Sequence, residues 1–269
     1  MRVAVVGHVE WVELVHVDHV PNAGDIVHGT SVLEVPAGGG AVAAVQLARW
    51  GADTLLFTAL GGDALGLRAR DELVSRGVHV HAAPRSEPQR RALTLVDAQR
   101  ERTIVVIGDR LVAHGSDALP WQALATCDAV YVTGGDVEAV RHARSARIVV
   151  ATSRVLPLLR DAAIDLDVLI GSDSDPAERY TAGDLPRPPK LVVRTEGARG
   201  GYVVHADGMR RRYTAVPATV TGDTYGAGDT FAAALTFALG ERRSLDDALS
   251  FASARAAEVV GFQGPYPRA

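Results

Sequence analysis

The run Gly222–Phe231 (Gly-Asp-Thr-Tyr-Gly-Ala-Gly-Asp-Thr-Phe) holds the residue types with the clearest chemical meaning in this chain of 269 residues. It leads into an alanine-rich apolar stretch that is typical of a helix. Glycines at the beginning of a helix let backbone N–H groups converge, and the helix dipole there favours an anion. A carboxylate in such a nest would repel a phosphate, so Asp229 is predicted to take a proton from an attacking hydroxyl. The amides of Gly226, Ala227 and Gly228 would then stabilise charge on a transferred phosphoryl group.

A structural role for Asp229 fits the same spacing, because Asp is a favoured helix N-cap residue. Two aspartates, Asp223 and Asp229, flank the glycines in this run. That pairing is less common than a single capping residue, and it favours the catalytic interpretation.

Two further glycine-rich segments carry weaker signals. Gly38, Gly39 and Gly40 open a predicted helix, but glycine runs serve many tight turns. The segment lacks the G-x-G-x-x-G order and the downstream acidic residue of a dinucleotide fold, which argues against an NAD-dependent dehydrogenase. In Gly61–Gly66, Asp63 precedes a helical pattern and is predicted to be its N-cap.

Composition excludes several classes of function. The formal net charge of −4 offers no basic field for nucleic acid or an anionic membrane surface. No run approaches the roughly 20 apolar residues of a membrane span, so we expect a cytoplasmic enzyme. Cys127 is the single cysteine, which leaves no internal disulfide and no cysteine-based zinc site. Lys190 is the single lysine and follows two prolines, so the chain has no P-loop.

Short apolar runs alternate with helical patterns, which predicts a mostly parallel sheet in one domain spanning residues 1–269. Strands are expected at 3–6, 54–60, 129–132, 147–151, 168–170, 190–194 and 201–205, and helices at 40–50, 64–76, 120–125, 137–144, 230–239 and 244–260. Segments 12–35 and 92–107 instead alternate apolar and polar residues. They predict antiparallel strands of a small second sheet, either a lid over a site or a dimer surface.

Two motifs resemble those of the ribokinase-like, or pfkB, family of carbohydrate kinases. Asp223–Phe231 fits the specific pattern D-T-x-G-A-G-D-x-F, and Gly38–Gly51 followed by Gly62–Val78 fits the N-terminal motif more loosely. The resemblance extends from the first strand to about Gly264. It implies a three-layer α/β/α domain with a mostly parallel central sheet and a small β-sheet lid. It also implies ATP and Mg²⁺ as cofactors and a homodimer formed through the lid.

The resemblance assigns roles to individual residues. Asp229 would be the catalytic base and the Gly226–Gly228 amides its anion hole. Asp223 and Thr224 would lie near the phosphates and a monovalent cation such as K⁺. The segment 195–200 matches T-x-G-x-x-G and would hold the nucleotide through Thr195, Gly197 and Gly200. Ser253 would lie beside the adenine.

Some positions depart from the family pattern. Ser172 and Asp175 stand where the family often has N-x-x-E near Mg²⁺. The shorter Asp175 would act on the metal through a water molecule, or it caps the segment after Pro176. Val12 and Val42 replace polar groups that commonly bind sugar hydroxyls, which favours a less hydroxylated acceptor.

The remaining candidates for acceptor contacts are Glu10, His8, Trp11 and Arg110. Glu10 is expected where open α/β sheets place ligands, at a strand's carboxyl end. Trp11 would stack on a ring or pack at a dimer seam, and His8 fits a structural role better than a ligand contact. Two hypotheses follow. The first is an ATP-dependent kinase for an alcohol group of a sugar, sugar derivative or nucleoside-like compound; the second is a nucleotide- or metabolite-binding regulatory protein that has lost catalysis.

Overall fold

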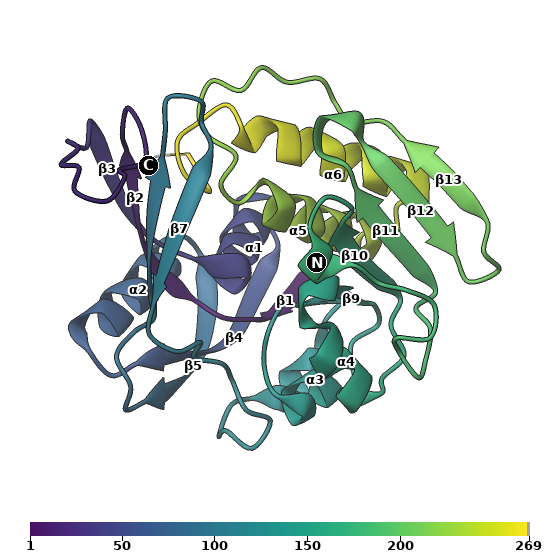
Figure 1. Cartoon of the computed structure of the whole chain (residues 1–269). Coiled ribbons are helices and arrows are strands. Elements are labelled where there is room, and N and C mark those ends of the chain that lie inside the picture. Colours follow the sequence, from purple (N-terminus) through teal and green to yellow (C-terminus); the bar gives the residue numbers. More distant parts are fainter. Residues whose placement is uncertain (268–269) are drawn as a thin grey trace.

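A large twisted sheet forms the centre of the molecule, as Figure 1 shows for the computed structural model, which describes residues 1–267. Its strand order is β13-β12-β11-β10-β9-β8-β1-β4-β5. The pairs from β5 to β11 are parallel, and only β12 and β13 add antiparallel pairs. The strands are β1 (Arg2–Val6), β4 (Asp53–Gly61), β5 (Val78–Arg85), β8 (Ala129–Val132), β9 (Val149–Thr152), β10 (Val168–Ser172), β11 (Leu191–Thr195), β12 (Gly201–His205) and β13 (Arg210–Tyr213).

The sheet is buried on both faces, because apolar side chains alternate between two cores. Val3 and Val5 of β1 join one core, whereas Ala4 and Val6 join the other. Continuous apolar strands of this kind are expected when helices cover both sides of a parallel sheet.

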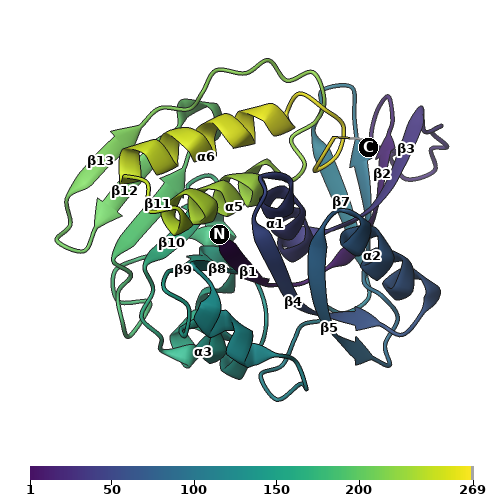
Figure 2. The ribbon, with the colours of Figure 1, turned by 180° about the vertical axis from the view of Figure 1, so that it is seen from behind.

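Helices α1 (Gly38–Arg49), α2 (Ala64–Ser75), α5 (Ala227–Gly240) and α6 (Leu245–Val259) contribute to the first core. Helices α3 (Val137–Ala143) and α4 (Leu156–Ala162) contribute to the second, with the 3₁₀ turn η1 (Trp121–Thr126). Figure 2 shows α3 on the opposite side of the sheet from α5 and α6. This confirms the three-layer α/β/α prediction. The helix expected at 120–125 is a 3₁₀ turn, and β5, β13 and α4 were not predicted.

The smaller sheet, which we call the lid, has the order β3-β2-β6-β7. Its strands are β2 (Glu10–His16), β3 (Ser31–Ala37), β6 (Arg91–Val96) and β7 (Arg102–Ile107). The prediction of purely antiparallel strands was wrong in one respect, because β2 and β6 pair in parallel. The reason is topological: β2 and β6 follow β1 and β5, which run the same way in the main sheet.

The lid contacts the body at the glycine-rich run. Arg100, in the turn between β6 and β7, donates from Nη1 to the carbonyl oxygen of Gly222 at 2.8 Å. Short 3₁₀ turns η2 (Ser153–Val155), η3 (Pro176–Glu178) and η4 (Gly197–Arg199) follow β9, β10 and β11. Within residues 1–267, no helix combines the length and apolar character needed to cross a membrane. Residues 268 and 269 of the predicted domain lie outside the described part.

Candidate active site

The glycine-rich run forms an open nest of amides at the beginning of α5. Gly226 is the N-cap residue and has φ of 79°, a left-handed conformation that favours glycine. A side chain at position 226 would also clash, because an added Cβ would lie 2.9 Å from the Cβ of Pro265. Within residues 1–267, the N–H groups of Gly226 and Gly228 donate to no protein acceptor, and that of Ala227 makes only a 3.4 Å bond to the Thr224 carbonyl. Unpaired amides at a helix N-terminus are suited to binding an anion.

Asp229 lies in the first turn of α5 and is not its cap. No side chain caps this helix, because glycine occupies the N-cap position. In the described part of the chain, the Asp229 carboxylate accepts no hydrogen bond. The structural alternative raised by the sequence is therefore wrong, and the carboxylate is free to accept a proton.

The beginning of α1 lies directly against this carboxylate. A Cβ added at Gly39 would lie 3.1 Å from Oδ1 of Asp229 and 2.6 Å from Oγ1 of Thr133. The Gly40 N–H donates to the carbonyl of His8 at 3.1 Å, which fixes α1 against the loop that follows β1. The glycines are needed for this close approach. The structure thus brings together two segments that are far apart in the sequence.

The environment of Asp229 makes it a weaker acid than a solvated aspartate. Burial raises its pKa to about 6, and the negative charges of Glu178 and Glu10 act in the same direction. Arg154 and Arg102 oppose the shift. A general base works best with a pKa near the working pH, so this shift suits proton abstraction near neutrality.

Glu10 is the first residue of β2 and is buried in a charged cluster. Its Oε1 lies 2.7 Å from Nε of Arg90 and 3.6 Å from Nε2 of His8. Burial, with Arg110 and Arg90 nearby, lowers the pKa of His8 to about 3, so the imidazole is neutral. The charge of Glu10 also raises the pKa of Asp229. The two side chains approach neighbouring residues at the beginning of α1, Glu10 at Gly38 and Asp229 at Gly39.

Trp11 and the two valines belong to the core. The Trp11 side chain is only 1% exposed, and the Arg68 guanidinium lies 4.4 Å from its ring centroid. This corrects the expectation of a stacking or dimer-seam residue, because no face of the ring is open to a ligand or partner. Val12 and Val42 are also fully buried, and Val42 packs near Gly226.

Arg154 organises the carboxylates that follow β10. Its Nη2 lies 2.9 Å from Oδ2 of Asp175 and also contacts Glu178. Asp175 is the N-cap of η3 and accepts from the Ala177 amide at 2.9 Å, which confirms the capping interpretation. Glu178 accepts from the Ser172 amide at 2.7 Å. Glu178 was not predicted, although it lies one turn beyond the capping aspartate.

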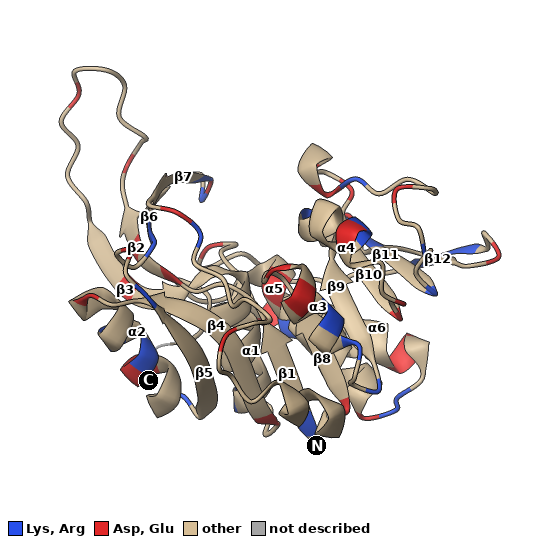
Figure 3. Cartoon of the chain, turned by 90° about the horizontal axis from the view of Figure 1, so that it is seen from below, with Lys and Arg blue, Asp and Glu red and all other residues tan. Residues whose placement is uncertain are grey.

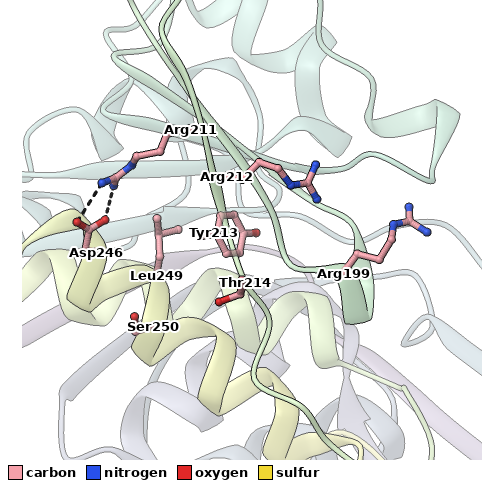
Figure 4. Close-up of a pocket in the computed structure, with 8 residues that line it drawn as sticks. All are labelled: Arg199, Arg211, Arg212, Tyr213, Thr214, Asp246, Leu249 and Ser250. Carbon is pink, nitrogen blue, oxygen red and sulfur yellow. Dashed lines mark hydrogen bonds and ion pairs between the residues drawn. The ribbon is translucent and has the colours of Figure 1, made fainter.

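The predicted nucleotide segment forms the turn between β11 and β12. Thr195 ends β11, while Gly197 and Gly200 have φ of 59° and 82°. Beside this turn, β13 and the first half of α6 enclose a pocket of about 480 Å³ (Figure 4). Arg199 of η4 lines it, together with Arg211, Arg212, Tyr213, Thr214, Asp246, Leu249 and Ser250. Ser253 is buried farther along α6 and does not line this pocket, so its place beside the adenine stays a prediction.

Asp223 is fully buried and holds the loop in place. Its Oδ1 accepts from the Tyr225 amide at 2.8 Å and its Oδ2 from the Gly264 amide at 2.8 Å. Both carboxylate oxygens therefore serve the backbone. The side chain positions the glycine nest and ties it to the C-terminal segment, and Thr224 lies half-buried beside it.

Comparison with known proteins decides the family. A model of the pfkB family of carbohydrate kinases matches residues 1–165 and 165–268. The chain belongs to this family. Ribokinase from Bacillus subtilis is 28% identical over 286 residues, covering 99% of this chain and 96% of the relative.

Solved structures share the same fold. A putative ribokinase from Agrobacterium tumefaciens has a TM-score of 0.83 at 24% identity, covering 98% of this chain and 92% of its own. Ribokinase from Arabidopsis thaliana, solved with ribose and ATP, has a TM-score of 0.77 at 19% identity, covering 98% and 96%. At these identities the likeness shows the ribokinase fold, as the sequence motifs predicted.

Proposed function

We propose that this pfkB-family protein is an ATP-dependent phosphotransferase that phosphorylates an alcohol group of a small molecule. The supporting observation is the Asp229 carboxylate, which does not cap the helix and lies beside the unpaired Gly226 and Gly228 amides. Asp229 would remove the proton of the attacking hydroxyl, and the nest would stabilise charge on the transferred phosphoryl group. The acceptor would lie between Asp229, Glu10 and the beginning of α1, where the backbone of Gly38, Gly39 and Gly40 would face it.

ATP is proposed from the family and from the ATP found in the Arabidopsis relative. The turn Thr195–Gly200 and the adjoining pocket would receive the nucleotide. Arg199 and Tyr213 line that pocket, the latter with an aromatic ring that lies 5.9 Å from that of Phe231.

Magnesium would arrive with the nucleotide phosphates. Among residues 1–267, no three His, Cys, Asp or Glu side chains gather as a metal site. Mg²⁺ is commonly held by one or two carboxylates, waters and substrate phosphates, so such a cluster is not required. Asp175 and Glu178 are the nearby carboxylates, and both already bind Arg154, so they fit contact through water. A monovalent cation such as K⁺ near Asp223 stays a prediction, because both Asp223 oxygens are already engaged.

A homodimer formed through the lid is also proposed. Strand β7 is at the edge of its sheet and exposes four consecutive apolar side chains: Ile104, Val105, Val106 and Ile107. An exposed apolar edge strand is a ready surface for another chain.

The test of the activity is release of ADP from ATP and Mg²⁺ across a panel of sugars, sugar derivatives and nucleosides. Activity that depends on one class of acceptor and disappears in Asp229→Asn supports the proposal. ATP binding by calorimetry without turnover of any acceptor would instead favour the regulatory protein.

A further inference from the structure

The side chain of Gln46 is buried between α1 and α5, although glutamine is found mostly at protein surfaces. It is only 1% exposed. Its Nε2 donates to Oγ1 of Thr230 at 3.2 Å and to the carbonyl oxygen of Pro265 at 2.9 Å. Its Oε1 accepts from Nη1 of Arg49 at 2.7 Å. Because a guanidinium can only donate and a carbonyl can only accept, these partners define the orientation of the amide. One side chain thus joins α1 to α5 and to the C-terminal segment.

Gln46 lies on the face of α1 that meets the candidate active site. Gly39, Val42 and Gln46 are spaced i, i+3 and i+7, so they share one face of the helix. A Cβ added at Gly39 would lie 3.1 Å from Oδ1 of Asp229. One turn farther along, Cγ1 of Val42 lies 3.2 Å from the position of a Cβ added at Gly226. The same face of α1 therefore approaches the proposed base, the glycine nest and then Gln46's own partners.

The other contacts between these two helices have little directional character. Helix α1 carries no acidic residue and one basic residue, Arg49 in its last turn, so most of its ribbon is tan in Figure 3. Apolar contacts are non-directional and leave two helices free to slide by small amounts, whereas a hydrogen bond has a defined length and angle. Within residues 1–267, the bond from Gln46 to Thr230 is the one side-chain hydrogen bond between α1 and α5.

Both partners of the Gln46 Nε2 are next to groups that the proposed reaction uses. Thr230 directly follows Asp229 in the first turn of α5. Pro265 packs against Gly226, the N-cap residue of the same helix and part of the nest. Gln46 therefore contacts the neighbours of the base and of the nest at once. A misplacement of about 1 Å between reacting groups can reduce a rate by about 10²-fold.

We propose, building on the proposed kinase function, that Gln46 is a positioning residue for phosphoryl transfer. Through Thr230 and Pro265 it fixes the beginning of α5 against the beginning of α1. This sets the distance between the Asp229 carboxylate and an acceptor held at the glycines of α1. Because Gln46 lies behind the site and contacts its neighbours only, its loss lowers kcat and leaves KM for ATP unchanged.

Gln46→Met is the main variant, because methionine is unbranched, similar in length and without an amide. The assay uses the full-length protein, ATP, Mg²⁺ and the sugar or nucleoside of the panel that the wild type turns over fastest. We expect kcat to fall by about 10- to 100-fold, the effect of a misplacement of about 1 Å or less, with KM for ATP unchanged. A purely structural role would lower the stability of the variant and leave kcat of the folded molecules at the wild-type value.

A double-mutant cycle identifies the contact through which Gln46 acts. Thr230→Val removes the other partner of the hydrogen bond and keeps the shape of the side chain. Because both single variants break the same bond, kcat of the double variant should fall by much less than the product of the two single losses. If Gln46→Met does not fold, Thr230→Val alone carries the test and should lower kcat in the same direction.

Thr54→Val is the matched control for loss of a buried hydroxyl. Thr54 is fully buried at the beginning of β4, at the opposite end of the strand from Gly61, and its Oγ1 donates to the carbonyl of Ala52 at 3.2 Å. Urea unfolding of each variant establishes the conditions in which it is fully folded, and kcat is compared there. Thr54→Val should keep the wild-type kcat whatever its loss of stability.

The outcomes separate this inference from the proposed function. A folded Gln46→Met with the wild-type kcat overturns the inference and leaves the kinase intact, as do single losses that multiply in the double variant. A raised KM for ATP at an unchanged kcat would assign Gln46 to nucleotide binding and also overturn it. If the wild type turns over no member of the panel, the proposed function fails. Crystal structures of the wild type and Gln46→Met then decide the positioning claim, which is overturned unless the distance from Gly39 to the Asp229 carboxylate differs between them.

Discussion

Replacing Asp229 with asparagine tests the catalytic and the electrostatic arguments at once. The substitution keeps the size of the side chain and removes its charge. Because the proposed base is lost, kcat should fall by about 10²- to 10⁴-fold, the usual contribution of general base catalysis. Stability should change in the opposite direction, because the wild-type carboxylate is destabilised by its surroundings.

The size of the stability change follows from the pKa. Burial raises the pKa of Asp229 from 3.8 to about 6. A shift of about two units corresponds to roughly 3 kcal/mol, and partial exposure of the side chain reduces this to about 1–3 kcal/mol. Because the folded pKa lies above the unfolded pKa, ionisation costs stability progressively between pH 3.8 and 6 and fully above pH 6. Asp229→Asn should therefore be more stable than the wild type at pH 8, and the gain should vanish near pH 4.

The assays are urea unfolding between pH 4 and 8 and a pH profile of wild-type kcat/KM. The gain above pH 6 should appear as an increase of about 1–3 kcal/mol in the free energy of unfolding, and thermal unfolding at pH 8 should show a rise in Tm of about 2–10 °C. Wild-type kcat/KM should fall about tenfold per pH unit below pH 6 and level off above it. A variant that is less stable than the wild type at pH 8, or that keeps its activity, would refute the reasoning.

Three other predictions follow from the same contacts. Glu178→Gln removes a negative charge that raises the pKa of Asp229, so the acidic limb of the kcat/KM profile should move to lower pH; an unchanged limb would contradict this. Asp223→Asn replaces one of two oxygens that accept backbone hydrogen bonds, so urea unfolding should show a loss of about 1–3 kcal/mol, and no loss would argue against its positioning role. Val105→Glu on β7 should convert the proposed dimer to monomers in sedimentation measurements, whereas Val74→Glu, equally exposed on α2, should not; a wild-type monomer would rule the dimer out.

Local patterns in the sequence were enough to predict the principal elements of the fold. Apolar runs marked the central strands, because a strand buried on both faces needs continuous apolar residues. They missed β5, whose His79 and His81 interrupt the apolar pattern, and β13, which is mostly arginine. Pairing in the lid was also out of reach, because the parallel contact of β2 with β6 depends on strands distant in the chain.

The residues of the site also fall into two groups, those that the sequence could identify and those that it could not. Asp229 and the glycine nest could be identified from the sequence because their chemistry depends on neighbouring residues in one turn. Glu178, Arg90 and Arg154 could not, since their importance comes from contacts across the fold. Trp11 shows the opposite error: its type suggested a ligand contact, and packing beneath Arg68 placed it in the core.

The sequence by itself determined the α/β class, the candidate base and the family motifs, since each is encoded in residue type and short spacing. Only the tertiary structure decided which charges surround that base. Ion pairs such as that of Glu10 with Arg90 form when the beginning of β2 and the segment before β6 meet beside α1. Electrostatic neighbours are set by distance in space, and this is why they became visible only in the folded chain.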